Sequence, residues 1–315
     1  MRICKIIPAV ILCCAAIQAR AQYDAQLSQY WAMPAYYNPG AAGSTPMLNL
    51  RAATRQQWIG MPGAPKTFLV MGDMPFRLFK QQHGAGLQIS TEKIGLYSNT
   101  SLALQYSFKV KLLGGELGLG LQFGLINQLF NGSDVYIPES DYHSKTDEGI
   151  PTNEVKGMAF DLGTGVYYTH KYFFAGISAQ HLTSPTITFD DKYETYIIPS
   201  YYFIAGGNIP FKNALYQLQP SMLVKTTFQT TQVEFGATLK YNKFLWGGIS
   251  YRLNDAIIFM VGGEWKNIML GYAYDYSLSD IVKANSGSHE IFVGYSMKID
   301  FGKKNKNKHK SIRIL

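Results

Sequence analysis

The feature that most constrains the fold of this chain is a strict alternation of apolar side chains with polar or small ones. In residues 101–111 every second side chain is apolar. Successive side chains of a β-strand point to opposite faces, so this period of two predicts a strand of about ten residues. The same two-faced pattern returns in residues 117–125, 158–168, 232–241 and 291–301.

Connection lengths distinguish a soluble sandwich, which also alternates, from a membrane barrel. We read fourteen strands near residues 47–57, 66–76, 83–91, 98–110, 115–130, 156–168, 171–182, 201–210, 215–226, 230–241, 244–252, 256–266, 267–277 and 289–301. Longer connections at residues 60–65, 92–97, 131–155, 183–200 and 278–288 alternate with short ones, although two near Phe228 and Asn254 depart from the rule. This asymmetry predicts an all-β outer-membrane β-barrel of about 14 antiparallel strands.

The composition agrees with a membrane barrel. The chain is 47% hydrophobic and only 16% charged, too few charges for an ordinary soluble surface. After residue 21 no apolar run reaches the roughly 18 residues that a membrane-spanning helix needs. Aromatic residues cluster beside predicted turns near Tyr172 and Phe244, as expected where strands pass from hydrocarbon to headgroups. The alternative is a soluble β domain with these rings in its core.

The beginning of the chain has the order of a secretory signal peptide. Arg2 and Lys5 precede an apolar stretch, and an Ala-Arg-Ala cleavage site ends at Ala21. All three cysteines lie inside residues 1–21. We therefore expect export through a cleavable signal peptide, a periplasmic N-terminal segment over 22–46, a barrel over 47–301 and a basic tail over 302–315. Six Lys and Arg residues lie in 303–313, so the basic balance predicts no nucleic-acid surface on the barrel.

The sequence offers little for catalysis. Ser288, His289 and Glu290 include the residue types of a catalytic triad, but adjacent strand residues point to opposite faces and cannot form a relay. Acidic residues at 134–148 and 190–194 lack the spacing of a calcium loop, which favours solvated loop charge over a metal site. We predict neither an enzyme nor a cofactor. Glycines recur on the predicted lumen face, where they either permit bending or leave space: Gly118, Gly120, Gly163, Gly165, Gly236 and Gly294.

Several short motifs together resemble one known family. They are Tyr37 to Gly43, Arg55 to Gly60, Gly63 to Thr67, Tyr251 with Arg252, Asp255 to Ile257, Gly271 to Tyr276 and Gly287 to Ile291. Their order and spacing resemble the PorP/SprF family of the Bacteroidota type IX secretion system, over residues 22–301. Gly40 departs from the family pattern, in which Ala is usual after Asn-Pro.

The resemblance implies an integral outer-membrane protein that serves type IX secretion. In gliding bacteria such proteins serve gliding motility through export or surface attachment of adhesins. It also implies three kinds of partner: outer-membrane lipids, a secreted cargo or surface adhesin at the extracellular loops, and periplasmic lipoprotein or ring components of the secretion system.

We therefore predict a non-catalytic adaptor, whose loops at 131–155, 183–200 and 278–288 face the cargo. The alternative is a diffusion pore or a hydrophobic-substrate transporter, because fourteen strands can enclose a lumen. Candidate structural or partner contacts are Asn38, Pro39, Gly40, Arg55, Trp58, Tyr272, Tyr274, Asp275, His289 and Glu290. Asn38 to Gly40 are expected to form a turn before the first strand. Arg55 and Trp58 are expected at its outer end, as a loop latch or as a partner contact. The tail either remains solvated or binds an acidic periplasmic face.

Overall fold

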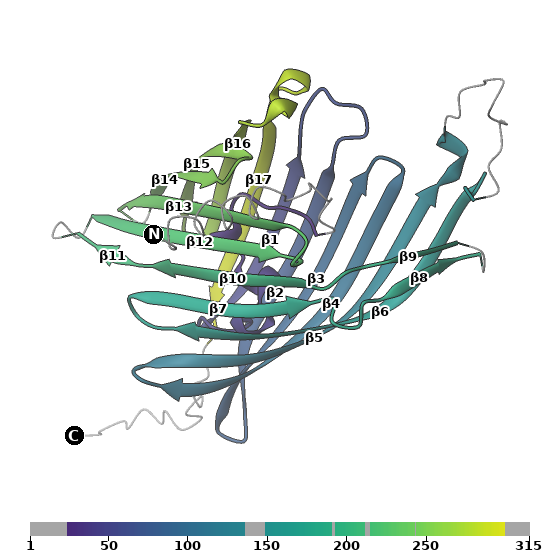
Figure 1. Cartoon of the computed structure of the whole chain (residues 1–315). Coiled ribbons are helices and arrows are strands. Elements are labelled where there is room, and N and C mark those ends of the chain that lie inside the picture. The colour runs from purple at the N-terminus through teal and green to yellow at the C-terminus, as the bar shows by residue number, and fades with distance from the viewer. Residues whose placement is uncertain (1–23, 136–148, 191–192, 212–214, 243, 300–315) are drawn as a thin grey trace, which may run out of the picture.

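The computed structural model describes residues 24–135, 149–190, 193–211, 215–242 and 244–299. Its strands form one antiparallel sheet that closes on itself, because β10 pairs with both β7 and β12 while β1 pairs with β17 (Figure 1). The fourteen barrel strands are β1 (Met47–Gln56), β2 (Lys66–Leu78), β3 (Gln81–Ile94), β4 (Tyr97–Leu112), β5 (Gly115–Asn131), β6 (Glu154–Thr169), β7 (Phe173–Gln180), β10 (Ser200–Gly207), β12 (Tyr216–Thr226), β13 (Thr231–Tyr241), β14 (Leu245–Arg252), β15 (Ala256–Trp265), β16 (Ile268–Ser277) and β17 (Ser288–Lys298). The predicted fold class and strand number are confirmed.

Three shorter strands lie outside this count. β8 (Thr186–Phe189) and β9 (Tyr193–Tyr196) form a hairpin within the connection between β7 and β10, and β11 (Ile209–Pro210) extends the edge beside β12. Short helices are η2 (Tyr30–Ala32), α2 (Pro34–Tyr37), η3 (Pro39–Ala41), η4 (Gly132–Asp134) and η5 (Asp280–Ala284). No helix in the described part of the chain is long and apolar enough to cross a membrane.

Tight turns lie at one end of the barrel. β2 and β3 are joined by Phe79 and Lys80, and β4 and β5 by Leu113 and Gly114, all four with positive φ. Positive φ at both central residues matches the twist of antiparallel strands. The connections at the opposite end include the long ones between β5 and β6, β7 and β10, and β16 and β17. Two predicted lengths are wrong. The connection predicted at 92–97 is only the turn 95–96, because β3 and β4 pair up to Ile94 and Tyr97 and Gly95 adopts positive φ, and the connection between β10 and β12 is longer than predicted because it contains β11.

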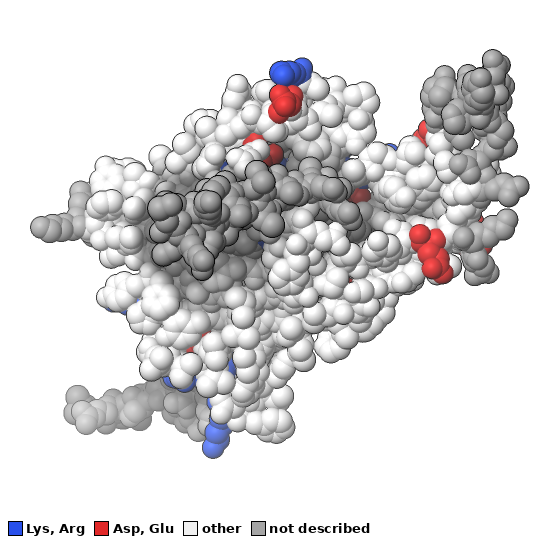
Figure 2. Space-filling model, in the orientation of Figure 1, with Lys and Arg blue, Asp and Glu red and all other residues white. Residues whose placement is uncertain are grey.

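The two faces of the wall differ as the alternation predicts. On β4, the Leu104 side chain points outward and is 58% exposed, whereas the neighbouring Gln105 points into the barrel and is 5% exposed. Figure 2 shows that few charged side chains lie on the wall in this view. An apolar exterior around a closed sheet suits a bilayer, where unpaired backbone groups would cost several kcal/mol each.

The height of the wall is uneven. β3 to β6 are 14, 16, 17 and 16 residues long, whereas β7, β10 and β14 have 8 residues each. Figure 1 shows β4, β5 and β6 rising beyond β7 and β10, with the β8–β9 hairpin beside them. A small core of Ile126, Val155, Ile187, Phe189 and Ile197 joins this hairpin to β5 and β6.

The N-terminal residues 24–46 lie inside the barrel and pack against inward-facing side chains. Leu27, Tyr30, Met33, Tyr37 and Ala42 of this segment are each at most 2% exposed and share a core with inward-facing strand residues. We call residues 24–46 the plug. The sequence predicts a periplasmic N-terminal segment over 22–46. In the structure the plug leads into β1 at the end of the barrel that carries the tight turns. Residues 1–21 and the basic tail 302–315, with their predicted roles, lie outside the described residues.

Candidate functional site

The plug contacts strands all around the barrel. Ser28 binds β16, Gln29 binds β17, Tyr30 binds β12 and Gly43 binds β2 through hydrogen bonds of 2.8–3.0 Å. On the other side of the lumen Asn38 binds β6 and β7. A segment of about twenty residues therefore crosses the lumen and ties together strands that are not neighbours in the sheet.

Asn38, Pro39 and Gly40 form the compact turn that the sequence predicts. The Asn38 Oδ1 atom accepts a 2.8 Å hydrogen bond from the Gly40 backbone amide, which caps η3. The Asn38 side-chain amide donates to the carbonyl oxygens of Val166 and Ile177, both at 3.0 Å. One side chain thus fixes the turn and also attaches it to the wall, and Asn38 is fully buried.

Glycines on the lumen face leave space for this turn. A Cβ atom on Gly120 would lie 2.1 Å from the Gly40 amide nitrogen, and one on Gly165 would lie 2.2 Å from the Asn38 Oδ1 atom. Real Cβ atoms do not approach other atoms so closely, so only glycine fits at these two positions of the wall. Gly40 is itself constrained, because a Cβ there would lie 2.7 Å from the Gly118 carbonyl oxygen. Of the two roles that the sequence left open, these glycines leave space.

Two strand residues bind the Gly40 carbonyl oxygen. Lys109 Nζ donates a hydrogen bond of 2.8 Å and Ser107 Oγ donates one of 3.2 Å. Both side chains are at most 3% exposed. A buried ammonium group is costly unless it is hydrogen-bonded, so the hydrogen bond to the Gly40 carbonyl oxygen offsets part of the cost of burying Lys109 and also holds the plug.

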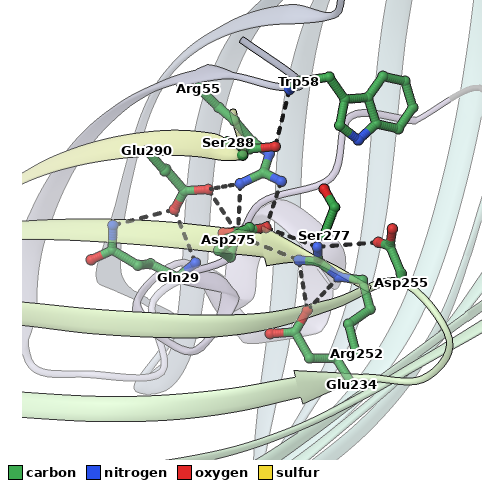
Figure 3. A network of polar contacts seen from close by, with 12 residues as sticks. Gln29, Arg55, Trp58, Glu234, Arg252, Asp255, Asp275, Ser277, Ser288 and Glu290 are labelled. Carbon is green, nitrogen blue, oxygen red and sulfur yellow. Dashed lines mark hydrogen bonds and ion pairs between the residues drawn. The ribbon is translucent and has the colours of Figure 1, made fainter. Parts of the chain in front are cut away.

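The start of the plug is held by a buried ion network between strands (Figure 3). Arg55 on β1 lies 2.7 Å from the Asp275 carboxylate on β16 and 3.6 Å from the Glu290 carboxylate on β17. Arg252 on β14 lies 2.9 Å from both Asp275 and Glu234. All five side chains are at most 3% exposed.

The plug completes this network. The Ser28 hydroxyl donates to Asp275 at 2.8 Å and accepts from Arg55 at 2.7 Å. The Glu290 carboxylate accepts hydrogen bonds of 2.6 and 2.9 Å from the backbone amides of Ser28 and Gln29. Buried charges stabilise a fold only when pairing and hydrogen bonding offset their desolvation. The network therefore requires residues 28 and 29 as well as the strands.

A second polar contact holds the first described residue. Asp24 lies 2.7 Å from the His181 ring, which also lies 3.0 Å from Asp161, and Asp24 accepts a hydrogen bond from the Tyr202 hydroxyl. Burial alone would raise the pKa of the Asp24 carboxyl, but the facing His181 and then Lys225 hold it well below its usual range. Burial alone would lower the pKa of His181, but Asp24 and Asp161 raise it to about 10. Asp24 and His181 thus form a charged pair.

The remaining candidate residues lie near the same end of the barrel. The Trp58 backbone amide donates to Ser288 Oγ at 3.1 Å, which links the connection after β1 to β17. The Tyr272 hydroxyl and His289 Nδ1 share a 2.6 Å hydrogen bond, and the Tyr274 ring packs against the same imidazole in a tilted arrangement, with ring centroids 5.2 Å apart. His289 lies on the outer face, whereas Ser288 and Glu290 are buried on the inner face, as their adjacency predicts.

The structure therefore sorts nine of the ten candidates into three groups and leaves Trp58 apart, with its backbone amide on Ser288. Asn38, Pro39 and Gly40 dock on β4 to β7, Arg55, Asp275 and Glu290 meet in the ion network, and Tyr272, Tyr274 and His289 meet on the outer wall. Sequence reasoning missed the partners in the ion network, Ser28, Gln29, Glu234 and Arg252, and the separate polar contact of Asp24, His181 and Lys225. One signal was present, because Glu234, Arg252 and Asp275 are charged residues at inward positions near strand ends.

Within the described ranges, no group of three or more His, Cys, Asp or Glu residues is placed to hold a metal ion. Most of the acidic cluster at 134–148 lies outside those ranges.

Comparisons with solved structures find distant outer-membrane proteins. The Pseudomonas putida toluene transporter TodX has a TM-score of 0.45 and 12% sequence identity, with 84% of this chain and 93% of that chain covered. Omp33 of Acinetobacter baumannii has a TM-score of 0.43 and 7% identity, with 80% and 98% covered. These likenesses say nothing of function, and no curated protein matches the sequence. The model of one family, however, matches residues 19–295, most of the chain. The protein therefore belongs to the type IX secretion system membrane protein family PorP/SprF.

Proposed function

We propose that this protein is a closed outer-membrane adaptor of type IX secretion, which holds a secreted protein at the cell surface and couples to periplasmic components of the system. Family membership and the barrel supply the setting. The observation that carries the adaptor role is the plug. A barrel whose lumen is occupied by its own buried N-terminal segment is suited to positioning surfaces rather than to passing solutes.

The proposed orientation places the longer connections outside the cell. These carry the β8–β9 hairpin, helix η5 and the raised ends of β4 to β6. The tight turns and the entry of the plug into β1 then face the periplasm. Outer-membrane barrels have long extracellular loops and short periplasmic turns, which supports this assignment.

The alternative remains a diffusion pore or hydrophobic-substrate transporter. One observation favours it: a cavity of about 350 Å³ lies between the plug and the strand ends near the tight turns, lined among others by Trp31, Arg51, Asp73, Lys240 and Glu264. For a pore, the plug would have to move, because Ser28 and Asn38 are hydrogen-bonded to opposite sides of the wall.

The test is to purify the tagged barrel from its own cells in mild detergent and to identify co-purifying secreted proteins. The adaptor predicts one or a few secreted proteins in near-stoichiometric amounts. It also predicts that the same proteins move from the cell surface to the medium when the barrel gene is deleted. Unchanged surface retention in the deletion strain would refute the adaptor.

A further inference from the structure

Strand β6 extends beyond the end of its neighbour β7 in the barrel wall. β6 pairs with β5 along its whole length, from Glu154 opposite Asn131 to Thr169 opposite Glu116. It pairs with β7 only from Thr164 to Thr169. Among the described strands, residues 154–163 therefore pair with β5 alone.

At Phe160 and Leu162 this edge of β6 accepts hydrogen bonds from the connection that follows β7. The Leu182 amide donates to the Leu162 carbonyl oxygen at 2.9 Å, and Thr183 Oγ1 donates to the Phe160 carbonyl oxygen at 3.2 Å. The amide and carbonyl of one strand residue point to the same side and alternate along the strand. The backbone groups of Glu154, Lys156 and Met158 consequently point away from β5 as well. Among the described residues none supplies a hydrogen bond to them on that side.

The free edge lies beyond the apolar band of the wall. In register across β3 to β6, the outward row Ile89, Leu102, Leu125 and Phe160 is apolar. The next row contains Thr91, Thr100 and Asn127 beside Met158, and the row after it contains Lys93, Ser98 and Lys156 together with one apolar residue, Leu129. Unpaired backbone groups at this height do not face hydrocarbon, where they would be very costly, and remain available to another strand.

The edge is also held rigid. On the inner side of β6, Val155 is 5% exposed and packs with Ile187 and Phe189 of the β8–β9 hairpin. Gly157 lies against the hairpin so closely that a Cβ there would be 2.5 Å from the Thr188 carbonyl oxygen. On the outer side, Met158 and Phe160 are 66% and 51% exposed. A rigid edge with exposed apolar side chains has the features of a strand-addition site.

We propose that the β6 edge from Glu154 to Met158 accepts an extended strand of the secreted protein that the barrel holds. The added strand would pair with the amides and carbonyls of Glu154, Lys156 and Met158. Every second side chain of the added strand would lie on the same outer face as Glu154, Lys156 and Met158. Its side chain beside Met158 would be apolar, and those beside Lys156 and Glu154 would be polar. This inference rests on the proposed adaptor function and names its contact surface.

The test separates backbone pairing from side-chain contact by comparing Met158→Pro with Met158→Ala. Proline removes the amide that faces the free edge and leaves the ladder to β5 intact, whereas alanine keeps that amide. The probe is the set of secreted proteins that co-purify with the tagged wild-type barrel, quantified by mass spectrometry. We expect Met158→Pro to lower their recovery about ten-fold or more, and Met158→Ala to leave it within about two-fold of wild type. Lys156→Pro and Lys156→Ala should repeat the contrast.

Each other outcome has a definite meaning. Equal recovery with the Pro and Ala variants overturns the strand-addition site and leaves the adaptor standing, whereas no secreted protein on the wild-type barrel means that the adaptor itself has failed.

Amide exchange on the purified barrel provides a second measurement that needs no partner. The Lys156 and Met158 amides should exchange much faster than those of Val155 and Gly157. Slow exchange at all four would show that this chain, or a second copy of it, already covers the edge, and would overturn the proposal. Heat-modifiable gel migration checks that every variant has folded.

Discussion

Arg55 on β1 and Asp275 on β16 form a 2.7 Å ion pair across the inner side of β17, the strand that separates them in the sheet. Both side chains are at most 2% exposed, and the Ser28 hydroxyl of the plug contacts both. The pair therefore links two strands that share no backbone hydrogen bonds, and it joins the plug to the wall.

Replacing Asp275 by Ala should destabilise the barrel strongly. The buried Arg55 and Arg252 would lose a shared carboxylate, and breaking a buried ion pair costs about 3–5 kcal/mol. The measurement is the temperature or urea concentration at which heat-modifiable migration is lost. The matched control is Asp280→Ala, because the Asp280–Lys283 pair also joins a carboxylate to a cation but is almost fully exposed. Similar shifts in the two variants would contradict the structural role of the network.

Replacing Gly120 by Ala should displace the plug while leaving the barrel assembled. The new methyl group would lie 2.1 Å from the Gly40 amide nitrogen, which is backbone and cannot move aside alone. The control is Gly247→Ala, where the nearest atom is at 3.7 Å. Limited proteolysis should cleave the plug at least several-fold faster in Gly120→Ala than in Gly247→Ala or wild type. Equal cleavage of the two variants would show that the turn does not dock as described.

The contribution of His181 to stability should depend on pH in one direction. The pKa of His181 is raised from 6.5 to about 10, so its pairing with Asp24 stabilises the fold fully below pH 6.5 and is lost as the pH rises through about 10. Asp24 has a lowered pKa, so its share persists above about pH 3.8 and is lost only in stronger acid. Asp161 faces the same ring, and Lys225 lies beside Asp24.

The check is the difference in melting temperature between wild type and His181→Gln at several pH values. The difference should have its full value from about pH 3.8 to pH 6.5 and should shrink toward zero as the pH rises from 6.5 to above 10. A difference that stays constant over this range would mean that His181 is not charged in the fold.

The barrel could be predicted from the sequence because its signals are local. Leu104 and Gln105 already differ in polarity, so their opposite faces follow from a period of two. The plug could not be predicted in the same way. Residues 24–46 contain no such period, and Asn38 finds its partners 128 and 139 residues away. The partners of Arg55 depend on the register of β16 and β17, and no local rule sets that register.

The two ends of the barrel should differ in accessibility. Lys283→Cys, in the connection between β16 and β17, should react with a membrane-impermeant thiol reagent on intact cells. Lys266→Cys, in the turn between β15 and β16, should react only after lysis. The opposite result would reverse the orientation, and it would place the free β6 edge in the periplasm.

Single-channel conductance in planar bilayers tests most directly the claim that the barrel is closed by its own N-terminal segment. The comparison is between the wild-type protein and a variant that lacks residues 24–44, with heat-modifiable migration as the control for assembly. We predict that wild-type insertions produce almost no current and that the deletion produces discrete conductance steps. Steady wild-type conductance equal to that of the deletion variant would contradict the account and would identify the protein as a pore.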